Sequence, residues 1–166
     1  MGLVFQIVDF KDIEEEQINK VLDKDGNPVL DKDGKEKEEK KVIKIKQAFP
    51  VNKLDIPYLS PYFDYEQYEE LKKALASRLG IELRTMVGYG GDIKWSDLKE
   101  EQQGLNLLLN RAGYEGSFTA EQCGSLEMPL RTLSQNIENL YIRKQAEILS
   151  DLFKTTKASG KSLKFC

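Results

Sequence analysis

LVFQIVDF, the sequence of residues 3–10, predicts a β-strand near the start of the chain. Successive side chains of a strand point to opposite faces of a sheet, so the apolar residues divide between two faces. One face carries Leu3, Phe5 and Ile7, and the other carries Val4, Val8 and Phe10. Because both faces are apolar, the segment predicts a strand that is buried on both sides.

The charge-rich segment that follows contains the repeat DKDG at residues 23–26 and again at residues 31–34. Asp-Gly pairs between β-forming residues are typical of hairpin turns. Such residues occur here at 21–22, 29–30 and 42–45. A calcium loop with Gly at its sixth position needs oxygen ligands at positions 1 and 12, where valine and lysine stand in both repeats. The repeat therefore predicts solvated hairpins.

Residues 50–63 contain three prolines and predict a rigid extended connector between a sheet-forming half and a helical half. A helix is expected directly after it, capped by Asp64 with Gln67 in a capping box and ended by Gly80. Thr119 and Gln122 repeat the capping-box pattern and predict another helix start.

The remaining helices are predicted from apolar spacing. Ser96 and Asp97 are expected to start a helix that becomes strongly apolar at residues 105–109. We expect Pro129 to interrupt the helix that begins after Thr119 and a long helix to follow over residues 130–152. Residues 163–165 are expected either to add a short strand or to dock on the core.

These elements predict one α+β domain over residues 1–166, with a small antiparallel sheet from the N-terminal third packed against three to five helices. Its expected parts are a strand and hairpin part at 1–49, the connector at 50–63 and a mainly helical part at 64–166.

The composition excludes several chemistries. The chain has no histidine, which excludes Ser-His and Cys-His catalysis within one chain, and its two cysteines cannot build a standard zinc site. A net charge of −3 argues against nucleic acid and anionic membranes as partners. No apolar stretch approaches the roughly 20 residues of a membrane-spanning helix. Without a basic leader at its start, the chain is expected to be cytoplasmic, with Cys123 and Cys166 reduced and no cofactor.

The glycine-rich stretch Gly88-Tyr89-Gly90-Gly91 is the first candidate site. Its backbone amides could approach a phosphate, but a phosphate loop ends in Lys-Ser or Lys-Thr, whereas Asp92 follows here and would repel an anion. We therefore favour a tight turn that buries Trp95. A small-ligand or nucleotide site formed by this turn and Trp95 is the alternative.

Two acidic patterns are candidates for metal binding. Residues 111–122 have the outline of an EF-hand with Gly116 at the sixth position, but Glu115 is the one carboxylate at a ligand position. Residues 14–16 are consecutive glutamates, whose side chains diverge on a strand or helix. We expect no metal site, and a carboxylate-dependent metal enzyme stays a second alternative.

Tyr58, Tyr62, Tyr65 and Tyr68 lie close together in the sequence. Tyrosine rings anchor many protein interfaces, and they also stack on single-stranded bases. No arginine cluster accompanies these four residues, so partner contact or core packing is favoured over nucleic-acid binding.

Several motifs occur together in the second part of the chain: the aromatic helix start at residues 65–71, Gly88–Gly91, Trp95, Leu107–Asn110 and Gly116–Cys123. With these motifs, residues 58–166 resemble a family of small uncharacterised proteins from bacteria and their phages. Family members typically carry a more acidic loop after the Leu-Leu-Asn, where this chain has residues 113–115 as Gly-Tyr-Glu. The resemblance implies no known activity, but it implies an accessory factor of a phage or mobile element, such as an inhibitor of a host system.

With these chemistries excluded, the sequence favours a non-enzymatic protein-binding or regulatory protein over an enzyme. The expected partner is another protein, contacted through the tyrosine-rich connector or through the charged hairpin.

Overall fold

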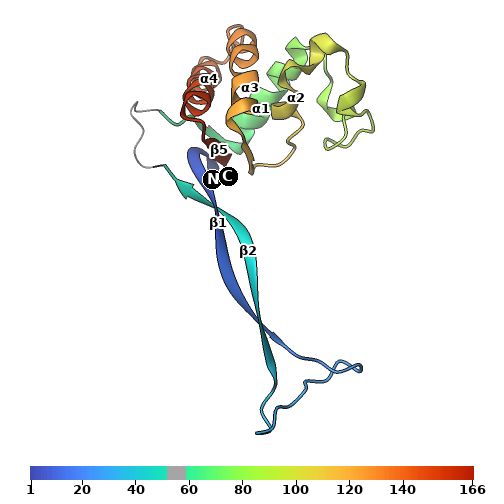
Figure 1. The fold of residues 1–166 in the computed structure, drawn as a ribbon. Helices are drawn as coiled ribbons and strands as arrows, with labels where there is room; N and C mark the ends of the chain where they lie inside the picture. The colour runs from blue at the N-terminus through green and yellow to red at the C-terminus, as the bar shows by residue number, and fades with distance from the viewer. Residues whose placement is uncertain (52–58) are drawn as a thin grey trace. The chain divides into compact units, whose positions relative to one another are not determined.

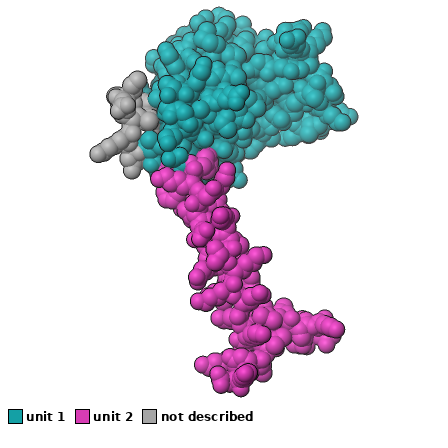
Figure 2. All heavy atoms as spheres, viewed as in Figure 1, with its two compact units in different colours: residues 1–9, 50–166 teal, residues 10–49 magenta. Residues whose placement is uncertain are grey.

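The computed structural model describes residues 1–51 and 59–166, so Pro57 and Tyr58 lie outside the described residues. The described chain divides into two compact units. Figure 2 shows the main unit, residues 1–9 and 50–166, and the hairpin unit, residues 10–49. The first nine residues belong with the helical part because they pair with residues 62–64 and with residues 162–165.

The five strands of the described residues form one antiparallel sheet (Figure 1). They are β1 (Gly2–Lys20), β2 (Glu38–Pro50), β3 (Tyr62–Asp64), β4 (Gly116–Phe118) and β5 (Ser162–Phe165). The strand order is β2-β1-β5-β4, and β3 pairs with the first residues of β1. The predicted α+β class is therefore confirmed, and the C-terminal residues add a strand.

β1 is buried on one face over its first residues. Leu3, Phe5 and Ile7 are at most 1% exposed, as the alternation predicts. On the second face, the prediction of burial is confirmed for Val8, which is 2% exposed, and wrong for Val4, which is 54% exposed, and for Phe10, which is 40% exposed. The buried face packs on helices, with Phe5 against α1 (Tyr65–Arg78), whereas the hairpin unit that Phe10 begins contains no helix to cover it.

The capping boxes place two helices as predicted. In α1 (Tyr65–Arg78), the Asp64 side chain accepts from the Gln67 amide, and the Gln67 side chain accepts from the Asp64 amide. In α3 (Ala120–Ser134), Thr119 and Gln122 form the same reciprocal pair. Gly80 follows α1 with φ of 68°, a left-handed conformation that favours glycine.

Two helix predictions are wrong in their boundaries. Pro129 lies inside α3, and this helix ends at Ser134. The Asn139 side chain accepts from the amides of Tyr141 and Ile142 and so caps a new helix, α4 (Leu140–Ser159). The helix predicted from Ser96 is replaced by two 3₁₀ segments, η2 (Trp95–Asp97) and η3 (Glu100–Leu105), and one turn of α-helix, α2 (Asn106–Leu109). A further 3₁₀ segment, η1, covers Leu83–Thr85.

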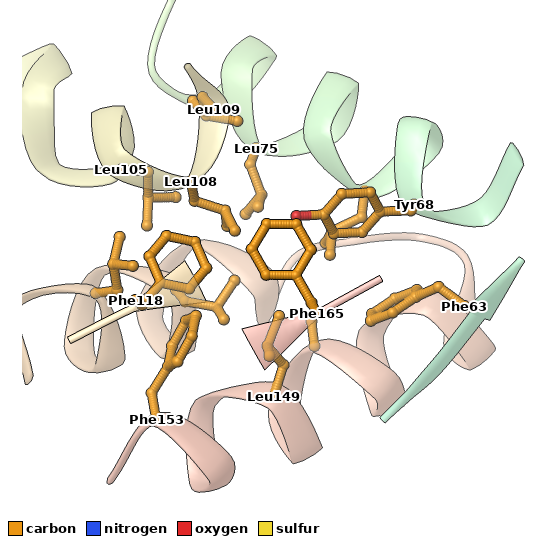
Figure 3. Close-up of a cluster of buried hydrophobic side chains, with 14 of the residues drawn as sticks. Phe63, Tyr68, Leu75, Leu105, Leu108, Leu109, Phe118, Leu149, Phe153 and Phe165 are labelled. Atoms are coloured by element: carbon orange, nitrogen blue, oxygen red, sulfur yellow. The ribbon is translucent and has the colours of Figure 1, made fainter. Parts of the chain in front are cut away.

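The core lies between the sheet and the helices (Figure 3). Phe165 of β5 is at its centre, and its ring stacks on Phe5 with centroids 5.5 Å apart and on Phe118 with centroids 5.4 Å apart. Phe153 of α4 meets Phe118 edge-on. Three strands and α4 therefore share one aromatic cluster, which joins residues from both ends of the chain.

The hairpin unit contains the two predicted turns, and its strands meet in a ring of hydrogen bonds. The amide of Val21 donates to the carbonyl of Lys37, Lys37 donates to Val29, and Val29 donates to Val21, at 2.7–2.9 Å. These three positions are eight residues apart, which is also the spacing of the DKDG repeat. The repeat therefore determines where the three segments meet. Each DKDG segment then forms its own small turn, closed by a bridge between Leu22 and Pro28 or between Leu30 and Glu36.

The first turn is expected to open in acid. The Asp23 carboxylate accepts from the amides of Asn27 and Asp25, each at 2.9 Å, and these bonds hold the pKa of Asp23 below its usual value. Because the folded-state pKa is lowered, the stabilisation is present above the unfolded-state pKa and is lost as the pH falls through the lowered value. Nuclear magnetic resonance titration should show the amide signals of Asp25 and Asn27 shifting together with the Asp23 carboxyl, and independent titrations would contradict this link.

Candidate functional site

The hairpin unit exposes nearly all of its side chains. No residue between Phe10 and Phe49 is buried, although the segment includes many large apolar side chains. The exposed ones are Phe10, Ile18, Leu22, Leu30, Val42 and Phe49. A two-stranded hairpin without a third strand or a helix is at best marginally stable in water. Contact with another molecule would supply the burial that this unit lacks.

The two strands of the hairpin unit carry opposite charges. Within the unit, β1 has Asp12 and residues 14–16 as acids against Lys11 and Lys20, while β2 has four lysines against Glu38 and Glu39. The lysines of β2 are Lys40, Lys41, Lys44 and Lys46. Two ion pairs join the segments of this unit, Lys40 with Glu16 at 3.8 Å and Lys20 with Glu36. Both pairs are exposed, so they contribute little to stability.

The described tyrosines of the predicted contact surface lie in different environments. Tyr62 of β3 is 53% exposed, and its backbone carbonyl accepts from the Tyr141 hydroxyl at 3.1 Å. Tyr65 is half-buried and stacks on Tyr114 with ring centroids 4.3 Å apart. Tyr68 is fully buried in the core, where no partner can reach it. Of the described tyrosines in this group, Tyr62 therefore offers the largest accessible surface.

A buried lysine in α1 organises the aromatic side chains beneath this surface. The Lys72 ammonium is fully buried and lies 5.0 Å from the ring centroid of Tyr68, 5.3 Å from Tyr89 and 5.6 Å from Tyr114. It also forms an ion pair with Glu69 at 2.5 Å. A cation over aromatic faces gains more when water is excluded. The three tyrosine rings therefore surround a cation that belongs to the chain itself, so this cluster of side chains stabilises the fold.

The glycine loop forms a structural turn, as the sequence favours. Gly88 and Gly90 have φ of 94° and 96°, and a side chain on Gly91 would lie 2.0 Å from the Thr85 backbone. The Tyr89 hydroxyl donates to the Leu109 carbonyl at 2.7 Å. Trp95 is 7% exposed. Its indole nitrogen donates to the carbonyl of Val87 at 3.0 Å.

A groove of about 530 Å³ lies beside Trp95. Its other lining residues are Ser96, Gln103, Asn106, Leu107, Asn110 and Arg111. The four glycine-loop residues Gly88–Gly91 do not line it. The Asn106 side-chain amide donates to the Trp95 carbonyl at 3.3 Å, and its oxygen has no hydrogen-bond partner among the described residues. Amides and a hydroxyl around an indole ring suit a small polar ligand with a flat apolar part.

The EF-hand-like segment uses its first position for packing. The Arg111 guanidinium lies 4.4 Å from the ring centroid of Phe118 and donates to the Ser117 carbonyl at 2.6 Å. Gly116 and Phe118 belong to β4, which pairs with β5. Across residues 1–51 and 59–166, no three acidic or thiol side chains come together in a way that could hold a metal ion.

The two thiols are expected to differ strongly in reactivity. Cys123 is fully buried, and burial raises its pKa to about 12, while Cys166 is exposed. The thiolate is the reactive form, so an alkylating reagent at neutral pH should modify Cys166 and leave Cys123 unmodified until the protein unfolds. Mass spectrometry of alkylated peptides measures both sites in one sample, and equal labelling in the folded protein would contradict the packing of α3.

Sequence reasoning missed Lys72, which is fully buried, and Arg111, which is half-buried with its guanidinium over Phe118. Long charged side chains are mostly exposed, so residue type argued against burial of Lys72. Its position, four residues after Tyr68 and three before Leu75, is the spacing of the buried face of α1 and was the available signal. Among the helices of the described residues, none is long and apolar enough to cross a membrane. Comparison of the chain with protein-family models, curated proteins and solved structures found no match.

Proposed function

We propose that the protein is a non-enzymatic, protein-binding accessory protein and that the hairpin unit is its contact element. The observation that carries the proposal is the absence of any buried residue from Phe10 to Phe49, in a segment with six exposed large apolar side chains. A two-stranded element with no buried side chain of its own is marginally stable alone, so these exposed apolar side chains support a role in contact with another molecule. The family resemblance supports the same class of function, including an inhibitor of a host system.

Hairpin geometry supports recognition through the backbone as well as through side chains. An exposed strand edge presents unpaired amides and carbonyls, to which a strand of another protein can add. β2 is the outermost strand of the sheet, and no strand of the described residues pairs with its outer edge. Charged residues along both strands would select among partners by charge complementarity rather than by shape alone.

The proposal is tested by removing the hairpin unit. In the variant, a two-residue Asn-Gly turn replaces residues 10–49, and thermal unfolding checks that the main unit remains folded. Both forms are expressed with a tag in the native host and purified, and a retained protein is identified and rebound as a pure component. We expect the intact chain to bind it and the shortened chain to lose it.

Tyr62→Ala in the intact chain is the matched control, because Tyr62 is exposed and lies outside the hairpin unit. We expect this variant to keep the partner. Equal binding by the shortened chain, or a loss of binding caused by Tyr62→Ala alone, would place the contact in the main unit and reject the proposal.

The groove beside Trp95 supports a second candidate function, binding of a small ligand such as a nucleotide. Trp95 is the single tryptophan of the chain, so its fluorescence reports on this groove alone. A nucleoside monophosphate is a suitable probe, because the face of its base is flat and apolar while its base edges and its sugar phosphate are polar. Saturable change in fluorescence that is lost in Asn110→Ala would support the site, and an unchanged spectrum at millimolar probe would exclude this ligand class.

A further inference from the structure

Both long edges of the hairpin unit are open. At Phe5–Val8, β1 pairs with β5 along one of its edges, and on that edge the described residues provide no strand beyond Val8. β2 is the last strand in the sheet order, and no strand of the described residues pairs with its outer edge. Two open edges on one hairpin can each accept a strand, so the hairpin can be extended on both sides.

The two open edges differ in charge. From Phe10 to Lys20, β1 has four acidic and two basic residues, a net charge of −2. From Glu38 to Phe49, β2 has four basic and two acidic residues, a net charge of +2. Most of these charges have no ion-pair partner within 4.0 Å in the described chain, since Lys40 with Glu16 and Lys20 with Glu36 are the pairs that form.

We propose, as a deeper form of the proposed function and resting on it, that the partner of the hairpin unit is a second copy of this chain. The acidic outer edge of β1 in one copy pairs with the basic outer edge of β2 in the next. Opposite charges on adjacent strands stabilise pairing, and like charges oppose it. Pairing of β1 with β1, or of β2 with β2, would place like charges together and is disfavoured.

This choice of edges fixes the symmetry class. An edge of β1 that meets an edge of β2 is a head-to-tail contact, which leaves one free β1 edge and one free β2 edge at the ends. Such contacts build either a closed ring or an open filament, and they exclude a two-fold dimer through these edges. The exposed side chains of Ile18 and Val42, one on each strand, would gain neighbours in the extended sheet.

Sedimentation velocity of the intact chain tests the inference through charge exchange. One variant carries Glu14→Lys and Glu15→Lys, a second carries Lys44→Glu and Lys46→Glu, and a third carries all four changes. The residues of the two observed ion pairs stay untouched. Reversing one strand makes both edges alike in sign, whereas reversing both strands restores opposite edges.

The wild type is expected to sediment as species larger than a monomer at about 0.05 M salt and to shift toward monomer at about 1 M salt, because screening weakens exposed charge pairs. Each single-strand variant is expected to be monomeric alone, to associate when mixed with the other, and to regain self-association when all four changes are combined. Circular dichroism and thermal unfolding confirm that all variants keep the main unit folded.

A wild type that is monomeric at low salt would overturn the inference, as would single-strand variants that associate like the wild type. Either result leaves the proposed function standing, because binding of a different protein through the hairpin unit is decided by the separate capture experiment with the shortened chain. A monomeric wild type together with equal capture of the partner by the intact and the shortened chain would reject the two together.

Discussion

Replacing Phe165 with alanine is expected to lower the free energy of unfolding of the main unit by about 3–5 kcal/mol. The Phe165 side chain is fully buried, and its ring stacks on Phe5 and Phe118 (Figure 3). Truncation removes these contacts and leaves a cavity between three strands, which the rigid sheet cannot close. Urea unfolding followed by circular dichroism measures the change.

Lys164→Ala is the matched control, because Lys164 is the neighbouring residue of β5 and its side chain is exposed. We expect this control to change the free energy of unfolding by less than about 0.5 kcal/mol. A Phe165→Ala protein as stable as the control would contradict the central place of β5 in the core.

The second large effect is expected at Lys72. Lys72→Ala should destabilise the main unit by about 2–4 kcal/mol, less than for a fully buried ion pair because a quarter of the Glu69 side chain is exposed. The change removes the cation from three tyrosine rings, leaves Glu69 without its partner and empties the space of the alkyl chain.

Lys72→Met separates packing from charge, because methionine fills most of the same space without a cation. Both variants leave Glu69 without its partner, so the difference between them reports the packing of the alkyl chain, and we expect Lys72→Met to lose less stability than Lys72→Ala. Equal losses in chemical unfolding experiments would show that the charge, rather than the packing, dominates the contribution of this residue.

Local signals account for much of the fold that the sequence predicts. The capping boxes at Asp64 and Thr119 depend on residues three positions apart, so the sequence alone determines both helix starts. The two Asp-Gly turns are local in the same sense. The α+β class follows from strand and helix periods that are separate along the chain.

Boundaries that depend on tertiary contacts could not be predicted. Pro129 remains inside α3, where its ring packs near Gly104, and the helix ends later, ahead of the Asn139 cap. Val4 and Phe10 are exposed because no helix covers them, which a pattern of apolar residues cannot reveal. Local apolarity predicts a strand but does not say what lies above it.

For the candidate site, the sequence predicted the charged hairpin but not the extent of its exposure. The ring of hydrogen bonds among Val21, Val29 and Lys37 joins positions eight residues apart. It can be recognised only once the three segments are placed in space. The nearby tyrosines looked alike in sequence, yet Tyr62 is exposed and Tyr68 is buried, since they occupy a strand edge and the core face of a helix.

The most direct test of the hairpin unit as the contact element is amide hydrogen exchange of the intact chain, free and in the complex purified from its host. We predict that residues 10–20 and 38–49 exchange rapidly in the free monomer, with no buried side chains to protect them, and slowly in the complex. Exchange in the helices of the main unit should stay the same. Slowing confined to the main unit, with the hairpin unit still exchanging rapidly in the complex, would contradict the account.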